Sequence, residues 1–170
     1  MLSIYKSILG LGFLLIMTFS SGVLAGPDNA PVPLPEEALI NQRGLSHFKR
    51  GYYEMIPRGR KAEAQQEMAR AEQAFTRAIE IDPDFTDAHR NLARLYYLQE
   101  KFEQAEIEYA QVMRLDPGDI DNYVQMAVVK AELGEFQEAI HYLEAAKEQT
   151  AEENIFLRLD EYIQKLSSVE

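Results

Sequence analysis

The stretch AEQAFTRAIEIDP at residues 71–83 is followed 34 positions later by AEIEYAQVMRLDP at residues 105–117, and its first part recurs as AIHYLEAA at residues 139–146. Each copy starts with alanine and has a large side chain four positions later, namely Phe75, Tyr109 and Leu143. The first two copies end in Asp-Pro, and proline does not continue a helix. A period of this length is typical of arrays of stacked helix pairs. The pattern therefore predicts a binding scaffold rather than a catalyst.

Apolar residues recur at helical spacing between and beyond these copies. Ala88, Leu92, Leu95 and Tyr96 form one apolar stripe, which places them on one face of a helix. The first unit is irregular, because its candidate first helix lies too far ahead of Ala71 for the same period. Residues 56–60 are therefore expected to form a loop and residues 61–81 a long second helix.

Two short motifs carry a resemblance to a known family. Leu92-Ala93 with Tyr96, and then Met126-Ala127, stand where the tetratricopeptide repeat family has Leu-Gly and Tyr, although Lys130 replaces the second Tyr. Residues 71–146 resemble that family. The resemblance implies an all-α fold, a right-handed superhelical solenoid of antiparallel helix pairs with a C-terminal capping helix. The domain is expected at residues 37–170, divided into an irregular repeat (37–85), two repeats (86–119 and 120–151) and the capping helix (152–167).

The N-terminus is typical of an export signal. Residues 1–25 read MLSIYKSILGLGFLLIMTFSSGVLA, with one positive charge at Lys6, an apolar run, and Val23-Leu24-Ala25 at the end. This pattern predicts a signal peptide that is cleaved after Ala25, with export to the periplasm or outside the cell. A retained membrane anchor is the alternative, because the apolar run approaches the roughly 20 residues that cross a bilayer. Residues 26–36, GPDNAPVPLPE, predict an extended proline-rich linker.

Composition narrows the possible functions. The chain has 17 Lys and Arg against 28 Asp and Glu, a net charge of −11, or −12 without residues 1–25. Such a surface repels nucleic acid. The chain has no cysteine, so disulfides, thiolate metal sites and lipid attachment through cysteine are all excluded.

No spacing of residues is typical of catalysis. His47, His89 and His141 lie far apart, and no glycine-rich loop follows the signal segment. The glutamates alternate with the apolar stripes at helical spacing, where a solvated face is expected. The sequence therefore predicts no enzyme activity, no cofactor and no metal site.

The resemblance implies a concave surface, lined by the first helix of each pair, on which a protein or peptide partner binds. The family positions that face this surface correspond to nine residues here: Asp87, Arg90, Asn91, Arg94, Tyr97, Asp121, Val124, Gln125 and Val128. Arg90 and Arg94 lie one turn apart and are placed to bind a carboxylate. The alternative is that they pair with neighbours such as Asp87. Asp121 and Gln125 do not match the basic clamp of the family's chaperone-tail subgroup.

A second candidate surface is basic. Residues 43–61 carry Arg43, Lys49, Arg50, Arg58, Arg60 and Lys61 against one acidic residue, a local charge of +5. Such a stretch is suited to an acidic partner or to anionic lipid. A solvated loop between helix ends is the alternative.

These features together predict an exported protein–protein interaction scaffold, a subunit or assembly factor of an envelope or extracellular complex. Contact with a membrane is expected only through a retained N-terminal segment. The main alternative is a structural protein that assembles with itself, as a homo-oligomer or filament of stacked solenoids. An enzyme is a remote third alternative.

Overall fold

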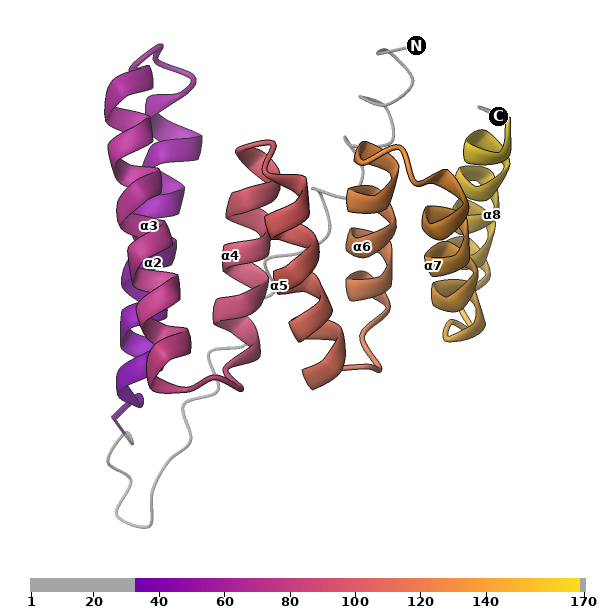
Figure 1. Cartoon of the computed structure of the whole chain (residues 1–170), viewed down its shortest axis with the longest axis horizontal. Coiled ribbons are helices and arrows are strands. Elements are labelled where there is room, and N and C mark those ends of the chain that lie inside the picture. The colour runs from indigo at the N-terminus through magenta and orange to yellow at the C-terminus, as the bar shows by residue number, and fades with distance from the viewer. Residues whose placement is uncertain (1–32, 169–170) are drawn as a thin grey trace.

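The computed structural model describes residues 33–168, so the predicted signal peptide and most of the predicted linker lie outside the described residues. Within this range the chain forms seven α-helices, one short π-helical segment and no strand (Figure 1). The elements are α2 (Glu36–Lys49), η1 (Arg50–Met55), α3 (Lys61–Ile81), α4 (Thr86–Leu98), α5 (Phe102–Leu115), α6 (Ile120–Glu132), α7 (Phe136–Glu148) and α8 (Glu153–Ser167).

The helices pack as consecutive pairs. In chain order, α2 packs against α3, α4 against α5 and α6 against α7, and α8 lies against α7 (Figure 1). Helix α3 also contacts α4, and α5 contacts α6, so each pair stacks on the one before it. The fold is an all-α helical solenoid, which confirms the fold class predicted from the repeat. We call the surface formed by α2, α4, α6 and α8, the first helix of each unit, the inner face.

The alanines of the repeat mark the closest helix contacts. Ala71, Ala105 and Ala139 are all 0 % exposed. Phe75 and Tyr109, four residues after the first two alanines, are buried as well. A small residue opposite a large one allows two helices to approach without a void. The period that is visible in the sequence is therefore the period of the core.

The turns between helices differ in their backbone demands. At the start of α6 the Asp119 carboxylate accepts a hydrogen bond from the Asp121 backbone N–H at 3.0 Å. Between α6 and α7, Gly134 has φ 80°, a conformation that glycine adopts freely. The corresponding turn between α4 and α5 places Glu100 at φ 59°. A side chain in this region costs about 1–2 kcal/mol, so this turn is strained where the next one is not.

The first pair depends on two close approaches between helices. A Cβ atom at Gly44 of α2 would lie 2.7 Å from the Phe75 ring, and one at Gly51 of η1 would lie 3.2 Å from the Ala64 carbonyl oxygen. Glycine at these two positions lets α2 and η1 lie against α3. Helix α3 is a single helix of 21 residues, over the span that the sequence predicts.

Helix α8 packs against α7 of the last helix pair. Leu159 and Leu166 are buried and share one core cluster with Leu143 and Ala146 of α7. Among residues 33–168, none of the helices combines the length and the apolar character needed to cross a bilayer.

Candidate functional site

Arg90 lies on the inner face and is held by acidic neighbours. Its guanidinium nitrogens lie 3.1 Å from a carboxylate oxygen of Asp87, 3.2 Å from one of Asp119 and 3.5 Å from one of Asp116. Asp87 is in the same helix, whereas Asp116 and Asp119 lie between α5 and α6. The pairing of Arg90 with Asp87 is the contact that the alternative interpretation of these arginines expects. Arg90 therefore joins α4 to the next pair.

The other three predicted residues of α4 also contact neighbouring first helices or their extensions. Asn91 donates a hydrogen bond to the Asn41 side chain of α2 at 3.0 Å, and Arg94 donates one to the Tyr53 hydroxyl at 3.2 Å. Tyr97 donates to a carboxylate oxygen of Glu132 in α6 at 3.4 Å, and burial raises the pKa of Tyr97 well above its usual value. These side chains lie on the inner face, where they link α4 to α2, to η1 and to α6.

An apolar groove lies between α6 and α8. It encloses about 530 Å³. Its wall on the α6 side includes Val124 and Val128, and its wall on the α8 side includes Ile155 and Tyr162, while Leu143 of α7 also lines it. We call this cavity the α6–α8 groove. Asp121, Val124, Gln125 and Val128, which are all the residues of α6 predicted from the sequence, line it.

Charged residues stand among the lining residues of the α6–α8 groove. Asp119, Asp121 and Glu152 are acidic, and Arg158 is the one Lys or Arg among the residues that line the groove. Partial removal of water, and then the nearby Asp119 carboxylate, raise the pKa of Asp121 above its ordinary value. The groove therefore combines an apolar interior with a partly acidic rim.

The contribution of α8 to this groove was not predicted. Ile155, Leu159 and Tyr162 appear in the sequence as the apolar stripe of a closing helix, and the repeat period ends before them. The same stripe has two roles in the structure, because Leu159 is buried against α7 and also lines the groove. The width of this apolar stripe, which exceeds what packing against α7 alone requires, was the sequence signal that could have indicated the groove.

Models of the tetratricopeptide repeat match residues 62–112 and residues 120–152. The chain belongs to the tetratricopeptide repeat family. No curated protein matches the chain.

Several solved tetratricopeptide domains are similar to this one in fold. The TPR2B domain of yeast Sti1, in a complex with pHsp70, has a TM-score of 0.61 at 19 % identity, and the match covers 79 % of this chain and 98 % of that one. The Arabidopsis OM64 TPR domain has a TM-score of 0.58 at 16 % identity, covering 76 % and 94 %. The first TPR of Spaghetti (RPAP3), bound to the HSP90 peptide SRMEEVD, has a TM-score of 0.56 at 19 % identity, covering 76 % and 94 %.

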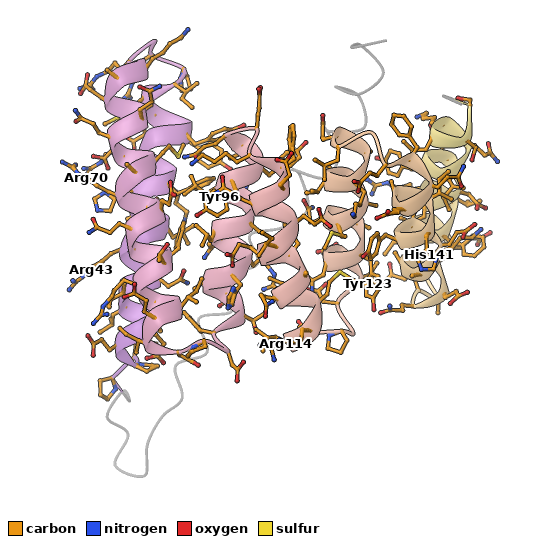
Figure 2. The ribbon with its side chains drawn as sticks, viewed as in Figure 1. Arg43, Arg70, Tyr96, Arg114, Tyr123 and His141 are labelled. Carbon is orange, nitrogen blue, oxygen red and sulfur yellow. The ribbon has the colours of Figure 1, made fainter. Side chains whose placement is uncertain are left out.

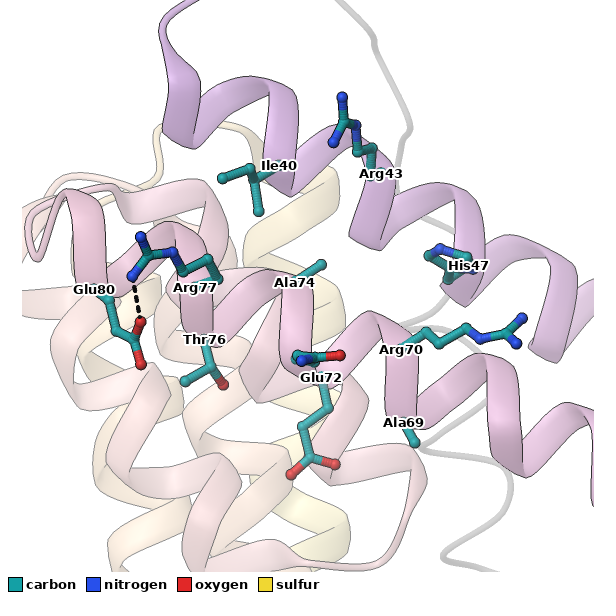
Figure 3. Close-up of a pocket in the computed structure, with 11 residues that line it drawn as sticks. Ile40, Arg43, His47, Ala69, Arg70, Glu72, Ala74, Thr76, Arg77 and Glu80 are labelled. Atoms are coloured by element: carbon teal, nitrogen blue, oxygen red, sulfur yellow. Dashed lines mark hydrogen bonds and ion pairs between the residues drawn. The ribbon is translucent and has the colours of Figure 1, made fainter.

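The predicted basic residues of this tetratricopeptide domain lie on α2, on η1, in the loop that follows and at the start of α3. Arg58 and Arg60 lie in the loop between η1 and α3, where they pair with Glu54 and Glu63. Lys61 begins α3 beside this loop, and Lys49 and Arg50 lie at the junction of α2 and η1. Arg43 of α2 lines a groove between α2 and α3 together with Arg70 and Arg77 of α3 (Figure 3).

The histidines take packing or surface positions. His47 Nδ1 lies 2.7 Å from a carboxylate oxygen of Glu67, and His89 Nδ1 lies 2.7 Å from one of Glu108. In both cases the histidine is in the first helix of a pair and the glutamate in the second. His141 is exposed on α7 (Figure 2). No cluster of metal-ligating side chains is found among the residues that the structure describes.

Lys130 is the least expected residue of the core. Its side chain is 8 % exposed, and its Nζ lies 2.8 Å from Glu106, 2.6 Å from Glu135 and 2.7 Å from Glu138. Burial alone would lower the pKa of Lys130, but hydrogen bonds to the three carboxylates raise it above its ordinary value. The lysine that departs from the family pattern thus ties α5, α6 and α7 together.

Proposed function

We propose that this tetratricopeptide repeat protein is a protein-interaction scaffold that binds a segment of a partner protein in the α6–α8 groove. The observation that carries the proposal is the apolar cavity of about 530 Å³ on the inner face. Concave apolar sites with a few polar groups are the usual form of a binding site. Two domains of similar fold support the idea, because the Spaghetti domain is bound to an HSP90 peptide and the Sti1 domain is in a complex with pHsp70.

The chemistry of the groove favours a segment with apolar anchor residues. Val124, Val128 and Ile155 offer apolar contacts, and burying apolar side chains there contributes about 25 cal/mol per Å². The carboxylates of Asp121 and Glu152 would repel an acidic tail such as SRMEEVD. The expected ligand is therefore an apolar segment with neutral or basic flanking residues.

A selection for binding peptides followed by one substitution tests this function. A phage-displayed peptide library is panned against the protein, and the affinity of the selected peptides is measured by fluorescence anisotropy. Val128→Arg places a long charged side chain in the groove and should weaken these peptides at least about tenfold. Ile107→Arg is the matched control, because Ile107 is 60 % exposed on α5 and does not line the groove.

The result that would overturn the proposal is a folded Val128→Arg protein that binds the selected peptides as tightly as the parent. Circular dichroism melts of both variants separate loss of binding from loss of fold. Arg94→Ala, measured with the same peptides, shows whether the bound segment also reaches α4, as the family positions predict.

Export is the second part of the proposal. The apolar run and Val23-Leu24-Ala25 support a signal peptide, and hence a role as subunit or assembly factor of an envelope or extracellular complex. N-terminal sequencing of protein from its native host should begin at Gly26. Recovery of an intact N-terminus in the membrane fraction would replace secretion with a retained anchor.

A further inference from the structure

The groove between α2 and α3 encloses about 740 Å³ on the outer side of the first pair (Figure 3). Its α2 side is formed by Ile40, Arg43 and His47, and its α3 side includes Arg70 and Arg77. It is separate from the α6–α8 groove and shares no lining residue with it. We call it the α2–α3 groove.

Three small residues show what this surface corresponds to in the other pairs. Gly44 packs against Phe75, Ala93 lies in one core cluster with Tyr109, and Ala127 lies in one with Leu143. In each case the small residue is in the first helix of a pair, and the large one is the repeated residue of the second helix. Gly44, Ala93 and Ala127 therefore occupy equivalent positions.

In α4 and α6, the residue that comes directly before this small residue packs toward the preceding helix pair. Leu92 is 3 % exposed and belongs to the core cluster of the first pair, and Met126 is 2 % exposed and belongs to the cluster of the second. Arg43 occupies the same position in α2 and is exposed. In the inner pairs α3 covers α4 and α5 covers α6, whereas within residues 33–168 no helix covers α2 in this way. On its α2 side the groove thus includes one position, that of Arg43, which the preceding pair covers in the later pairs.

The charges of this groove indicate which helix it would accept. Arg43 makes no ion pair among the described residues, while Arg77 pairs with Glu80 at 2.8 Å and Arg70 with the buried Glu67 at 2.6 Å. These three guanidinium groups and His47 line the groove together with the carboxylates of Glu72 and Glu80, in a chain whose net charge is −11. Guanidinium groups bind carboxylates well, in bidentate pairs where the geometry allows. We propose that the α2–α3 groove docks an acidic amphipathic helix of a partner protein, in the place that a preceding helix would take.

A designed peptide tests the docking site without knowledge of the partner. The probe is a fluorescent helical peptide of about 15 residues, with leucines along one face and glutamates beside them. A second peptide, with lysines in place of the glutamates, is the charge control. The acidic peptide should bind the purified protein with an affinity that falls as salt is raised, and the basic peptide should not bind this site.

Substitutions then place the bound peptide. Arg43→Glu should weaken binding of the acidic peptide at least about tenfold, because like charges across an interface oppose binding. Arg43 has no ion-pair partner to lose among the described residues, so this variant should melt like the parent. Arg77→Gln should weaken binding less, and Arg114→Glu on α5, with the same change in charge as Arg43→Glu, should leave it unchanged.

Three results would overturn the proposal. Equal affinity of Arg43→Glu and the parent would place the peptide elsewhere, and no binding of the acidic peptide would make the groove a solvated end of the solenoid. Binding to phosphatidylglycerol vesicles, lost in Arg43→Glu while the peptide fails to bind, would assign the groove to lipid. Val128→Arg should leave binding of the acidic peptide unchanged, which keeps this test independent of the α6–α8 groove.

Discussion

Replacing Lys130 with methionine tests whether its buried ion pairs stabilise the solenoid. Methionine keeps an unbranched apolar side chain in the space of the lysine stem, so the change removes mainly the charge and its hydrogen bonds. The lysine is 8 % exposed, whereas Glu106, Glu135 and Glu138 are 34 %, 43 % and 59 % exposed. Once the lysine is gone, these carboxylates regain water rather than staying buried and unpaired.

This difference in exposure sets the expected magnitude. Exposed ion pairs contribute about 0.2–1 kcal/mol each, and removing one partner of a fully buried pair costs about 3–5 kcal/mol. A buried cation among three partly hydrated carboxylates lies between these limits. We expect Lys130→Met to lower the free energy of unfolding by about 2–3 kcal/mol.

Urea denaturation at pH 7, followed by circular dichroism, measures this loss. Lys101→Met is the matched control, because Lys101 is 40 % exposed and makes a single ion pair within residues 33–168, with Glu72 at 3.7 Å. Its effect should stay within about 1 kcal/mol. A double-mutant cycle of Lys130→Met with Glu106→Gln isolates one pair of the network.

The pH dependence of the free energy of unfolding gives a second test of the Lys130 ion pairs. Because the folded-state pKa of Lys130 is raised, its contribution to stability is complete below the ordinary lysine value of 10.5 and is lost only as the pH rises through the folded value. The difference between parent and Lys130→Met should therefore be the same at pH 7 and at pH 9. A Lys130→Met protein as stable as the parent would show that the network gives no net stability, as is known for some buried ion pairs.

Three further substitutions test the packing of the solenoid and its first pair. Ala105→Leu should lower the free energy of unfolding by about 1–3 kcal/mol, because Ala105 is 0 % exposed at a helix contact; an unchanged urea midpoint would contradict the assigned helix packing. Gly44→Ala should destabilise the fold by a similar amount, about 1–3 kcal/mol, since its Cβ would lie 2.7 Å from the Phe75 ring. Gly118→Ala is the control and should not destabilise the fold, because nothing lies within 4 Å of a Cβ atom there. Equal melting temperatures for the two variants would refute the close approach of α2 and α3. The hydrogen bond from His47 lowers the pKa of Glu67 below 4.5, so the ionised Glu67 stabilises the fold above that pH. The loss of unfolding free energy in Glu67→Gln should therefore shrink as the pH falls below 4.5. A loss that stays constant with pH in urea denaturation would exclude this linkage.

The helix pairs could be predicted because their contacts repeat. Ala71, Ala105 and Ala139 recur at one spacing, and each is fully buried in the structure. Residues whose partners change from pair to pair could not be placed in this way. Lys130 was visible only as a departure from Tyr, since its three carboxylates come from α5, from α7 and from the turn that precedes α7.

The two grooves were hidden for a different reason, which is that each lies at an end of the repeat. Gly44 lies 49 positions before Ala93, whereas Ala93 lies 34 positions before Ala127, so the period gives no register for α2. Arg43 was therefore grouped with its sequence neighbours and not with Arg70 and Arg77. Helix α8 follows the last copy, so its share of the α6–α8 groove had no repeat position to predict it.

The same position in three successive first helices also bears on self-assembly. In α2 this position is Arg43, and no described helix covers it. In α4 and α6 it is Leu92 and Met126, which the preceding helix pair covers. An apolar residue at Arg43 would extend the apolar surface on which another solenoid could stack, whereas a guanidinium must lose water before an uncharged helix can cover it. A helix that carries carboxylates avoids this cost, because it gives the arginine an ion-pair partner as it covers it. The first pair is thus built to resist stacking by an apolar helix and to accept an acidic one, which favours a specific partner over an open filament at this end.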